Sequence, residues 1–365
     1  MKRFFVILVS LSLLVISLGL TGCVVEEENW SFNKSTGQLI ISGQQAAGTR
    51  WIFFDGKTSC PWEQYREQVK SVVIEEGIQT IGSSLFSDCS KIVSVQLPSS
   101  LTEIWGDAFS GCSNLASIEI PSSVTLIGGG AFEGCSSLTS IEIPSSVTVI
   151  GKDTFEGCSG LKYNEKDGVQ YLGNQENPYY AMVSVDGDVT SVSFDPNTKI
   201  ICGGAFSACV NLTDITIPSN ITSISGNAFD GCVGLEHVEI SKNITSLGGC
   251  CFYNCSNLTS VILPAELTII GPYFFSRCRS LETVVIPPNL TSIGEFAFEM
   301  CDSLKSIDIP ARVTSIERGA FWGCESLSNI NFSGTMEQAK KIFTAQTVLT
   351  SSVVIHCTDG DITVE

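Results

Sequence analysis

The amino-acid sequence predicts a right-handed solenoid of stacked, mostly β coils with short turns, closed by a cap at each end. Residues 111–135 and 134–158 have nearly the same sequence, GCSNLASIEIPSSVTLIGGGAFEGC and GCSSLTSIEIPSSVTVIGKDTFEGC. A cysteine recurs at a fixed interval over most of the chain, and a phenylalanine stands three positions before each of ten such cysteines. A period of about 23 residues is typical of solenoids, whose coils bury a core only by stacking on one another.

The segment 1–22 predicts a secretion signal that precedes the fold. A basic start, Lys2 and Arg3, is followed by an apolar run from Phe4 to Leu20. The run ends in Leu-Thr-Gly-Cys at 20–23, which resembles the bacterial lipobox. The resemblance implies cleavage before Cys23 and acylation of that residue, which would anchor the protein to a membrane. An uncleaved anchor made from the same apolar run is the alternative.

Each coil is expected to contain one half-buried strand followed by turns. Counting from the cysteine, aliphatic residues stand at +3, +6, +8, +12 and +15, with proline often at +9 and glycine often at +16. The alternation at +6 and +8 is typical of a strand with one buried face. Proline marks the end of that strand because it cannot donate to a ladder. Glycine at +16 indicates either a positive φ or a close backbone approach. The strands of successive coils are expected to form one parallel sheet.

These features divide the chain into a signal peptide (1–22), an acidic solvated tether (23–29), an N-terminal cap with a hairpin and a short helix (30–65), a solenoid of about 12 coils (66–333) and a C-terminal cap (334–365). The step from Cys158 to Cys209 is longer than two regular periods, so one repeat is irregular. Asp186 stands where a cysteine is missing. We expect the irregular repeat, at 158–186, to bulge as a hairpin.

The chain contains 16 cysteines, which in a secreted protein raises the possibility of a disulfide framework. Equivalent side chains on stacked coils point the same way, so their Cβ vectors do not converge as a disulfide requires. We therefore predict a column of buried thiols that pack and donate weakly to backbone carbonyls. The pairing of the cysteines outside the column stays open: Cys60, Cys202, Cys250, Cys251 and Cys357.

The composition excludes several classes of function. With 20 basic and 38 acidic residues, the chain carries a net charge of −18, which disfavours nucleic acids and anionic lipids as electrostatic partners. The two histidines, His237 and His356, stand in no catalytic or metal-binding motif. We expect a protein that is not an enzyme, that needs no cofactor and no metal, and whose function depends on its surface.

Two surface clusters are the candidate partner-binding residues. Glu119, Glu142 and Glu165 occupy the outward +7 position of consecutive coils and could dock a basic segment or a cation, or could form only a solvated face. Tyr163 lies near them and could anchor an interface or pack inside the irregular repeat. The second cluster combines acids with one histidine, whose presence could be incidental: Asp214, Glu236, His237 and Glu239.

The pattern C-x-x-L-T-S-I-x-I-P-x-x-V-T-x-I-G-x-x-A-F-x-x-C resembles the BspA-like, Treponema pallidum-type leucine-rich repeat surface lipoproteins over roughly residues 66–333. This resemblance implies a leucine-rich repeat solenoid on the cell surface that binds proteins, such as host matrix proteins or proteins of other bacteria. The resemblance also implies that the protein contacts the membrane through lipid on Cys23. The alternatives are a structural or periplasmic envelope scaffold without an external ligand, and a glycan-capture lipoprotein that uses exposed tyrosines between Tyr163 and Tyr180.

Overall fold

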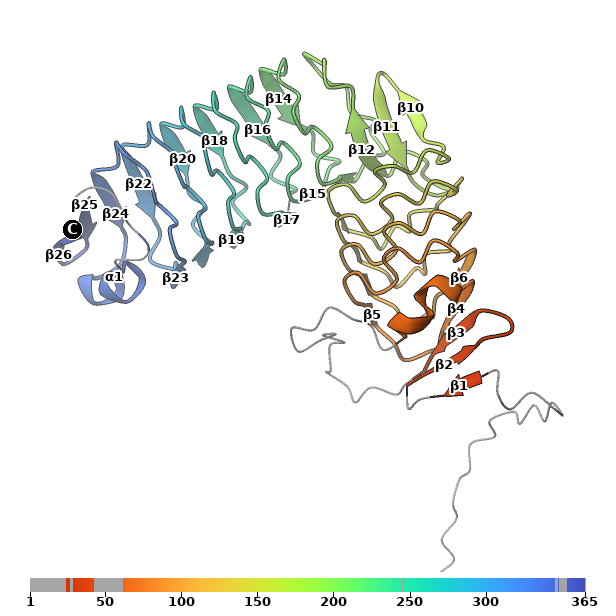
Figure 1. Ribbon diagram of the computed structural model, residues 1–365. Helices are drawn as coiled ribbons and strands as arrows, with labels where there is room; N and C mark the ends of the chain where they lie inside the picture. Colours follow the sequence, from red (N-terminus) through yellow and green to blue (C-terminus); the bar gives the residue numbers. More distant parts are fainter. Residues whose placement is uncertain are drawn as a thin grey trace, which may run out of the picture.

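The computed structural model describes residues 24–26, 29–42, 62–244, 246–344, 347 and 353–364. The predicted signal peptide, Cys23 and Cys60 lie outside these residues. The described chain is a β-solenoid bent into an arch (Figure 1), and equivalent positions of neighbouring coils are 23 residues apart, as Thr102 and Thr125 are. It contains one short 3-10 helix, η1 (Glu63–Gln68), and one α-helix, α1 (Met336–Ile342), so the predicted fold class is confirmed.

Two columns of parallel strands run along the arch. The outer column follows the outer rim in Figure 1 and contains β4 (Ser71–Ile74), β6 (Ser94–Gln96), β14 (Asp214–Ile217), β16 (His237–Ile240), β18 (Ser260–Ile262), β20 (Thr283–Val285), β22 (Ser306–Ile309) and β24 (Asn329–Phe332). The inner column contains β5 (Thr80–Ile81), β7 (Glu103–Ile104), β8 (Leu126–Ile127), β9 (Val149–Ile150), β13 (Ile200–Ile201), β15 (Ser223–Ile224), β17 (Ser246–Leu247), β19 (Ile269–Ile270), β21 (Ser292–Ile293) and β23 (Ser315–Ile316).

The expectation of one continuous parallel sheet is wrong, because the described strands fall into six sheets. In the coils of Cys112 and Cys135 the outer segments keep the buried alternation of the repeat, yet only a single parallel bridge, between Ser117 and Ser140, joins them. The side-chain pattern therefore persists where the ladder does not. Burial of every second side chain, rather than continuous pairing, is what the repeat specifies in these coils.

A column of stacked aromatic rings runs through the core. The phenylalanines at +20 stack with centroid separations of 5.2 Å for Phe229–Phe252 and 5.5 Å for Phe275–Phe298. Trp62 closes the N-terminal end of the column and stacks on Phe86 at 5.8 Å. Within each stack, from Phe86 to Phe155 and from Phe206 to Phe321, each ring lies against the ring of the next coil, so loss of one leaves a gap that its neighbours line.

The cysteine thiols form the predicted column beside these rings. Each of eight thiols donates to the carbonyl oxygen of the phenylalanine one coil earlier, as Cys232 does to Phe206 at 2.9 Å and Cys301 to Phe275 at 3.3 Å. These eight cysteines are free of disulfides, as are Cys202, Cys250, Cys251 and Cys357. Burial raises the pKa of Cys135 to about 12 and of Cys158 to about 11. The thiols therefore stay protonated and act as donors.

Glycine at +16 serves a close approach, because no positive φ is required there. A Cβ on Gly151 would collide with the backbone of Gly129 on the preceding coil, so a larger residue at this position would force the two coils to shift. Positive φ values occur instead at +18 and +22 of the coil, as in Asp153 (φ 58) and Gly157 (φ 70). The two left-handed residues let the chain turn back toward the next cysteine.

The irregular repeat divides the solenoid into two stacks. Three strands that pair antiparallel with one another form this repeat: β10 (Asn164–Lys166), β11 (Val169–Leu172) and β12 (Ala181–Val185). The start of β12 then pairs in parallel with β13, and the paired residues of both strands are buried on both faces. Ala181 and Ile200 pack into the core of the N-terminal stack, whereas Met182 and Ile201 pack into the core of the C-terminal stack.

On the inner side of the bend, the two stacks touch directly. The N–H of Gly203 donates to the carbonyl of Ile150 at 2.8 Å, and Lys152 forms an ion pair of 2.9 Å with Asp230. The residues inserted by the irregular repeat lie mostly on the outer side. The outer rim is therefore longer than the inner rim at this point, and the arch bends here (Figure 1).

The caps pair their strands antiparallel. At the N-terminus, β2 (Trp30–Asn33) and β3 (Gln38–Ile41) form a hairpin, and β3 pairs in parallel with β4. At the C-terminus, α1 is followed by β25 (Val353–Cys357) and β26 (Gly360–Val364), which form a second hairpin on β24. A capping box begins α1: Thr335 accepts from the N–H of Gln338, whose side chain accepts from the N–H of Thr335.

The structure differs from the predicted solvated tether at its first described residues. Val24–Glu26 form β1, which pairs antiparallel with β2. Val25 packs against the core of the N-terminal stack, which explains why this short segment is held in place. Among the described residues, no helix is long and apolar enough to cross a membrane.

Candidate functional site

The exposed side of the outer column in the C-terminal stack forms a regular surface. We call it the outer strand face and define it by the outward residues of β14, β16, β18, β20 and β22. In these strands every second residue is buried, and the residues at +5 and +7 point outward. Successive strands are paired in register from β14 to β20, so the outward residues form straight rows across the face.

The second predicted cluster lies on this face. Asp214 is the register partner of His237, Thr216 is the partner of Glu239, and Glu236 directly precedes β16. All of these side chains are exposed. The hydroxyl of Thr216 donates to Glu239 at 3.4 Å. The four predicted residues are therefore brought together on two neighbouring strands, where they make an acidic patch with one histidine.

Two exposed aliphatic residues continue the same row. Ile262 is the register partner of Glu239, and Val285 is the partner of Ile262. Their exposed fractions are 68% and 59%. Sequence reasoning placed these positions outward but did not select them as candidate site residues. The available signal was two aliphatic residues in a row whose other members are mostly polar.

The first predicted cluster does not form a continuous row. Glu119 and Glu142 are exposed at equivalent positions, but Glu165 lies on β10, whose pairing in the described sheet is antiparallel with β11. The segment that lies next to Glu142 in the outer column is instead the loop that follows β11. In this loop Gly173 accepts from the N–H of Ile143, and Gln175 donates to Glu142 at 3.1 Å. Insertion of the hairpin moves Glu165 out of the column.

Tyr163 packs inward rather than standing on the surface. It is half-buried against the core of the N-terminal stack. Burial is the main cause that raises the pKa of Tyr163 to about 12. The neighbouring tyrosines of the irregular repeat are also turned inward, since Tyr171 is 0% exposed and Tyr180 is 8% exposed. These rings do not form the open aromatic platform that glycan capture would use.

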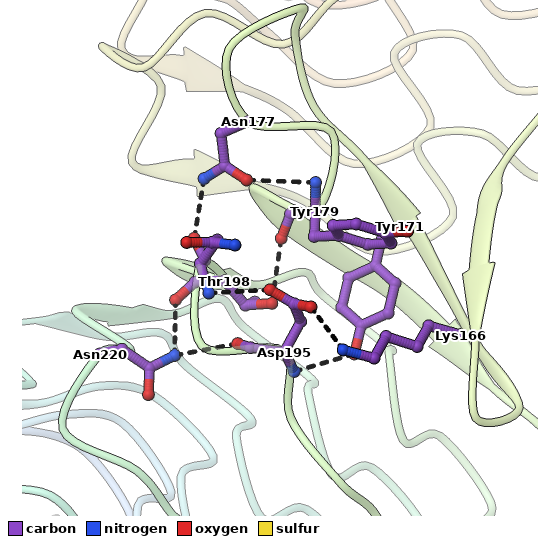
Figure 2. Close-up of polar contacts among 8 residues, drawn as sticks. Lys166, Tyr171, Asn177, Tyr179, Asp195, Thr198 and Asn220 are labelled. Atoms are coloured by element: carbon purple, nitrogen blue, oxygen red, sulfur yellow. Dashed lines mark hydrogen bonds and ion pairs between the residues drawn. The ribbon is translucent and has the colours of Figure 1, made fainter.

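A polar cluster holds the irregular repeat against the C-terminal stack (Figure 2). Lys166 on β10 forms an ion pair of 2.8 Å with Asp195, whose side chain is only 5% exposed. Burial alone would raise the pKa of Asp195, but the Lys166 ammonium and the N–H of Asn197 outweigh it, so this pKa lies below its usual value. Asn220, one coil further on, donates to the carbonyls of Asp195 and Thr198 at 3.2 and 2.9 Å.

The tyrosines of Figure 2 complete this polar cluster. The rings of Tyr171 and Tyr179 meet edge to face with their centroids 5.4 Å apart. The Lys166 ammonium lies 5.9 Å from the centroid of the Tyr179 ring, within reach of a cation–π attraction. The side chains of Asp195, Asn177 and Asn220 form hydrogen bonds with other groups of the cluster or with the neighbouring backbone. The cluster therefore stabilises the bend and does not present these groups to a ligand.

An open hollow of about 530 Å³ lies beside the β10–β11 hairpin and is lined by residues 165–170 and 184–186. Its walls carry the carboxylates of Glu165, Asp167 and Asp186. A smaller hollow of about 170 Å³ lies behind it against Tyr163 and Cys202. In the part of the chain that the structure describes, no group of three or more His, Cys, Asp or Glu side chains is arranged to hold a metal ion.

The fold and the repeated outward rows define a leucine-rich repeat protein. The family model described as "BspA type Leucine rich repeat region" matches this chain over residues 64–176, 180–287 and 246–361. The matched residues cover most of the chain. The chain therefore belongs to the BspA-type leucine-rich repeat family.

Solved structures with a similar fold come from several bacteria. A leucine-rich repeat protein from Bacteroides ovatus is 24% identical, with 92% of this chain and 99% of that chain covered and a TM-score of 0.39. A leucine-rich cell surface protein from Faecalibacterium prausnitzii is 24% identical, with 90% and 98% covered and a TM-score of 0.39. The T. pallidum leucine-rich repeat protein is 20% identical, with 76% and 87% covered and a TM-score of 0.24. A comparison with curated proteins found no match.

Proposed function

We propose that this protein is a lipid-anchored cell-surface scaffold that binds other proteins, with adhesion to host matrix proteins or to other bacteria as its biological role. The observation that carries this proposal is the outer strand face. Its side chains at +5 and +7 point outward across neighbouring strands in register, while the core is made by the residues between them. Repeat solenoids use such extended surfaces to bind proteins.

The separation of core and surface within each coil supports a binding role. Val238 and Ile240 are buried, while His237 and Glu239 on the same strand are exposed. Exchange of an exposed residue leaves the stacked core unchanged, so each coil can contribute a different side chain to a common surface. Strands fixed by their neighbours also lose little conformational freedom on binding, which favours affinity.

The predicted lipid on Cys23 fits this arrangement. Residue 24 begins β1, which pairs with the N-terminal hairpin. A lipid on the preceding residue would hold the N-terminal cap close to the membrane. The outer strand face belongs to the other stack, beyond the bend (Figure 1), and would therefore be presented away from the anchor.

Protease treatment of intact cells tests the location. We expect release of peptides from residues 66–333 without lysis, detected by mass spectrometry. The matched variant Cys23→Ser should lose membrane association while the soluble protein keeps its circular dichroism spectrum. If the peptides stay protected until the envelope is opened, the surface role is wrong and the protein is an internal envelope scaffold.

Binding assays test the adhesive role. Purified protein is applied to immobilised matrix proteins and to other bacteria, alongside the double variant Glu239→Gln, Ile262→Ser. The exposed positions of these residues predict a folded variant with weaker binding. Equal binding by the variant and the original protein would show that the outer strand face is not the binding surface.

A further inference from the structure

The outer strand face has an apolar centre between two carboxylates. Its +7 row runs from Glu239 on β16 through Ile262 on β18 and Val285 on β20. Asp308 on β22 occupies the equivalent position one coil further on and is also exposed. We call these four residues the mixed row. Aliphatic side chains that are 68% and 59% exposed lie next to each other in it, which is unusual for a strand face covered only by water.

The two carboxylates of the mixed row are each approached by a neutral donor. Thr216 donates to Glu239 at 3.4 Å, and the amide of Asn331 donates to Asp308 at 2.6 Å. Both donors stand in the same row on the sides away from the apolar pair. The ion pairs among the described residues involve other carboxylates. The carboxylates of the mixed row are thus hydrogen-bonded by neutral donors, and their negative charges are not neutralised by an ion pair.

The spacing of the mixed row matches an extended chain that crosses the strands. Neighbouring strands lie about 4.8 Å apart, so three steps from Glu239 to Asp308 span about 14 Å. An extended chain advances about 3.4 Å per residue and points every second side chain to the same side, so it covers this span in about four residues. Its first and fifth side chains would meet the carboxylates, and its third would meet the apolar pair.

We propose that the mixed row binds an extended basic segment of a protein partner with the pattern cation–x–aliphatic–x–cation. This inference rests on the proposed function and names the chemistry of the partner. A cation at each end would pair with Glu239 or Asp308, and the central aliphatic side chain would cover Ile262 and Val285. The neighbouring outward residues Ser260 and Thr283 are small, so they leave room for the segment to lie close to the sheet.

Charge decides against a second copy of this chain as the occupant. The chain carries a net charge of −18, and Glu236 and Glu282 add further negative charge beside the mixed row. Two such faces would repel each other, although Lys305 and His237 also lie on this face. A cationic segment gains both the ionic attraction and the burial of the apolar pair.

Labelled peptides test the inference on the full chain. The peptide TKTVTKT places both lysines and the valine on one side of an extended chain. The matched control TKVTTKT has the same composition and lysine spacing but turns the valine to the other side. Fluorescence anisotropy should show about tenfold tighter binding of TKTVTKT, weakening as salt is raised. Equal affinity of the two peptides would overturn the proposed pattern.

Variants locate the contact. Ile262→Ser with Val285→Ser should abolish the preference for TKTVTKT, whereas Ile269→Ser should not change it. Ile269 is a fair control because it is 54% exposed and lies on β19 of the inner column. Glu239→Gln with Asp308→Asn should remove most of the salt dependence. A preference that survives the Ile262 and Val285 changes would place binding elsewhere and overturn the inference.

The two proposals fail separately. If the protein binds matrix proteins or bacteria but does not distinguish the peptides, the mixed-row inference is wrong and the proposed function stands. If the peptides are distinguished as expected but the protein is shielded inside the envelope, the mixed row is supported as a binding site and the adhesive role is wrong.

Discussion

Phe229 shows how a single residue holds neighbouring coils together. Its ring is fully buried and stacks between Phe206 at 4.8 Å and Phe252 at 5.2 Å. The thiol of Cys255 donates to its carbonyl oxygen at 3.1 Å. The same residue therefore contributes to the core by its ring and to the turn ladder by its backbone.

Replacement of Phe229 by Ala should lower the free energy of unfolding by about 3–5 kcal/mol, because it removes a ring and leaves a cavity that rigid neighbours cannot fill. Urea denaturation followed by circular dichroism measures the change. Val210→Ala, at a position 46% exposed, is the control and should change stability little. An unchanged midpoint for Phe229→Ala would contradict the burial of the column.

The thiol column predicts a clear order of chemical reactivity. Burial raises the pKa of Cys324 to about 12, so little thiolate is present at neutral pH, and the side chain is only 2% exposed. In the native protein we expect N-ethylmaleimide to modify Cys250 and Cys357, which are partly exposed, well before the column. After denaturation without reductant, the column thiols should react too. Column cysteines that react only after reduction would indicate disulfides.

Asp195 is expected to make the free energy of unfolding depend on pH in the acidic range. Its folded pKa lies below the usual value of 3.8, so the stabilisation is present above that value and is lost as pH falls through the lower folded pKa. At neutral pH, Asp195→Asn should unfold at a lower temperature than the original protein, and this difference should shrink in acid below about pH 4. Thermal unfolding across pH measures it. Glu176→Gln, an exposed change in the same repeat, should show no such convergence.

At the scale of elements, the irregular repeat is the segment whose structure the local sequence pattern does not predict. The stacking of regular coils follows from positions that recur at a fixed period, and it was predicted correctly. Strands β10, β11 and β12 depend instead on contacts between residues whose spacing in the sequence does not follow the repeat. Lys166 meets Asp195 across 29 residues, and Lys152 meets Asp230 across 78 residues. Sequence indicated that the repeat was irregular and bulged, but not how it joined the stacks.

The candidate site shows the same division. The repeat predicted that Asp214, His237 and Glu239 would point outward and lie together, because their strands are regular. It misplaced Glu165, because the hairpin replaces the outer column there. It also did not reveal that Ile262 and Val285 stay uncovered, because exposure of an outward residue depends on whether another segment packs over it. Such coverage is a property of the folded chain.

The whole molecule behaves as two stacks of interchangeable coils joined at one bend. Within the C-terminal stack each coil meets its neighbours through the same register shift, the one that relates Thr216 to Glu239 and Glu239 to Ile262. Stability in such arrays is close to a sum over coils and their interfaces. The bend is different, because each core ends there on one face of the β12–β13 pair.

Deletion of residues 233–255 tests this description, because it removes one full period and joins Cys232 to Ser256 in register. We expect a shorter, folded arch with cooperative urea unfolding and unchanged circular dichroism per residue. Deletion of 233–250 removes a similar length out of register and should fail to fold cooperatively, because it sets buried against exposed positions. Equal stability of the two deletions would contradict the register argument.

The two stacks touch directly on the inner rim, so the outermost part of the irregular repeat is not needed to join them. Gly203 already reaches Ile150, and the turn between β10 and β11, at Asp167 and Gly168, is exposed and lies outside both cores. A change of length in this turn would leave both cores in register, whereas a change of one residue in a regular coil would disturb every coil beyond it. The bend is thus the place where this chain can accept an insertion, such as a tag or a small domain, without losing its architecture.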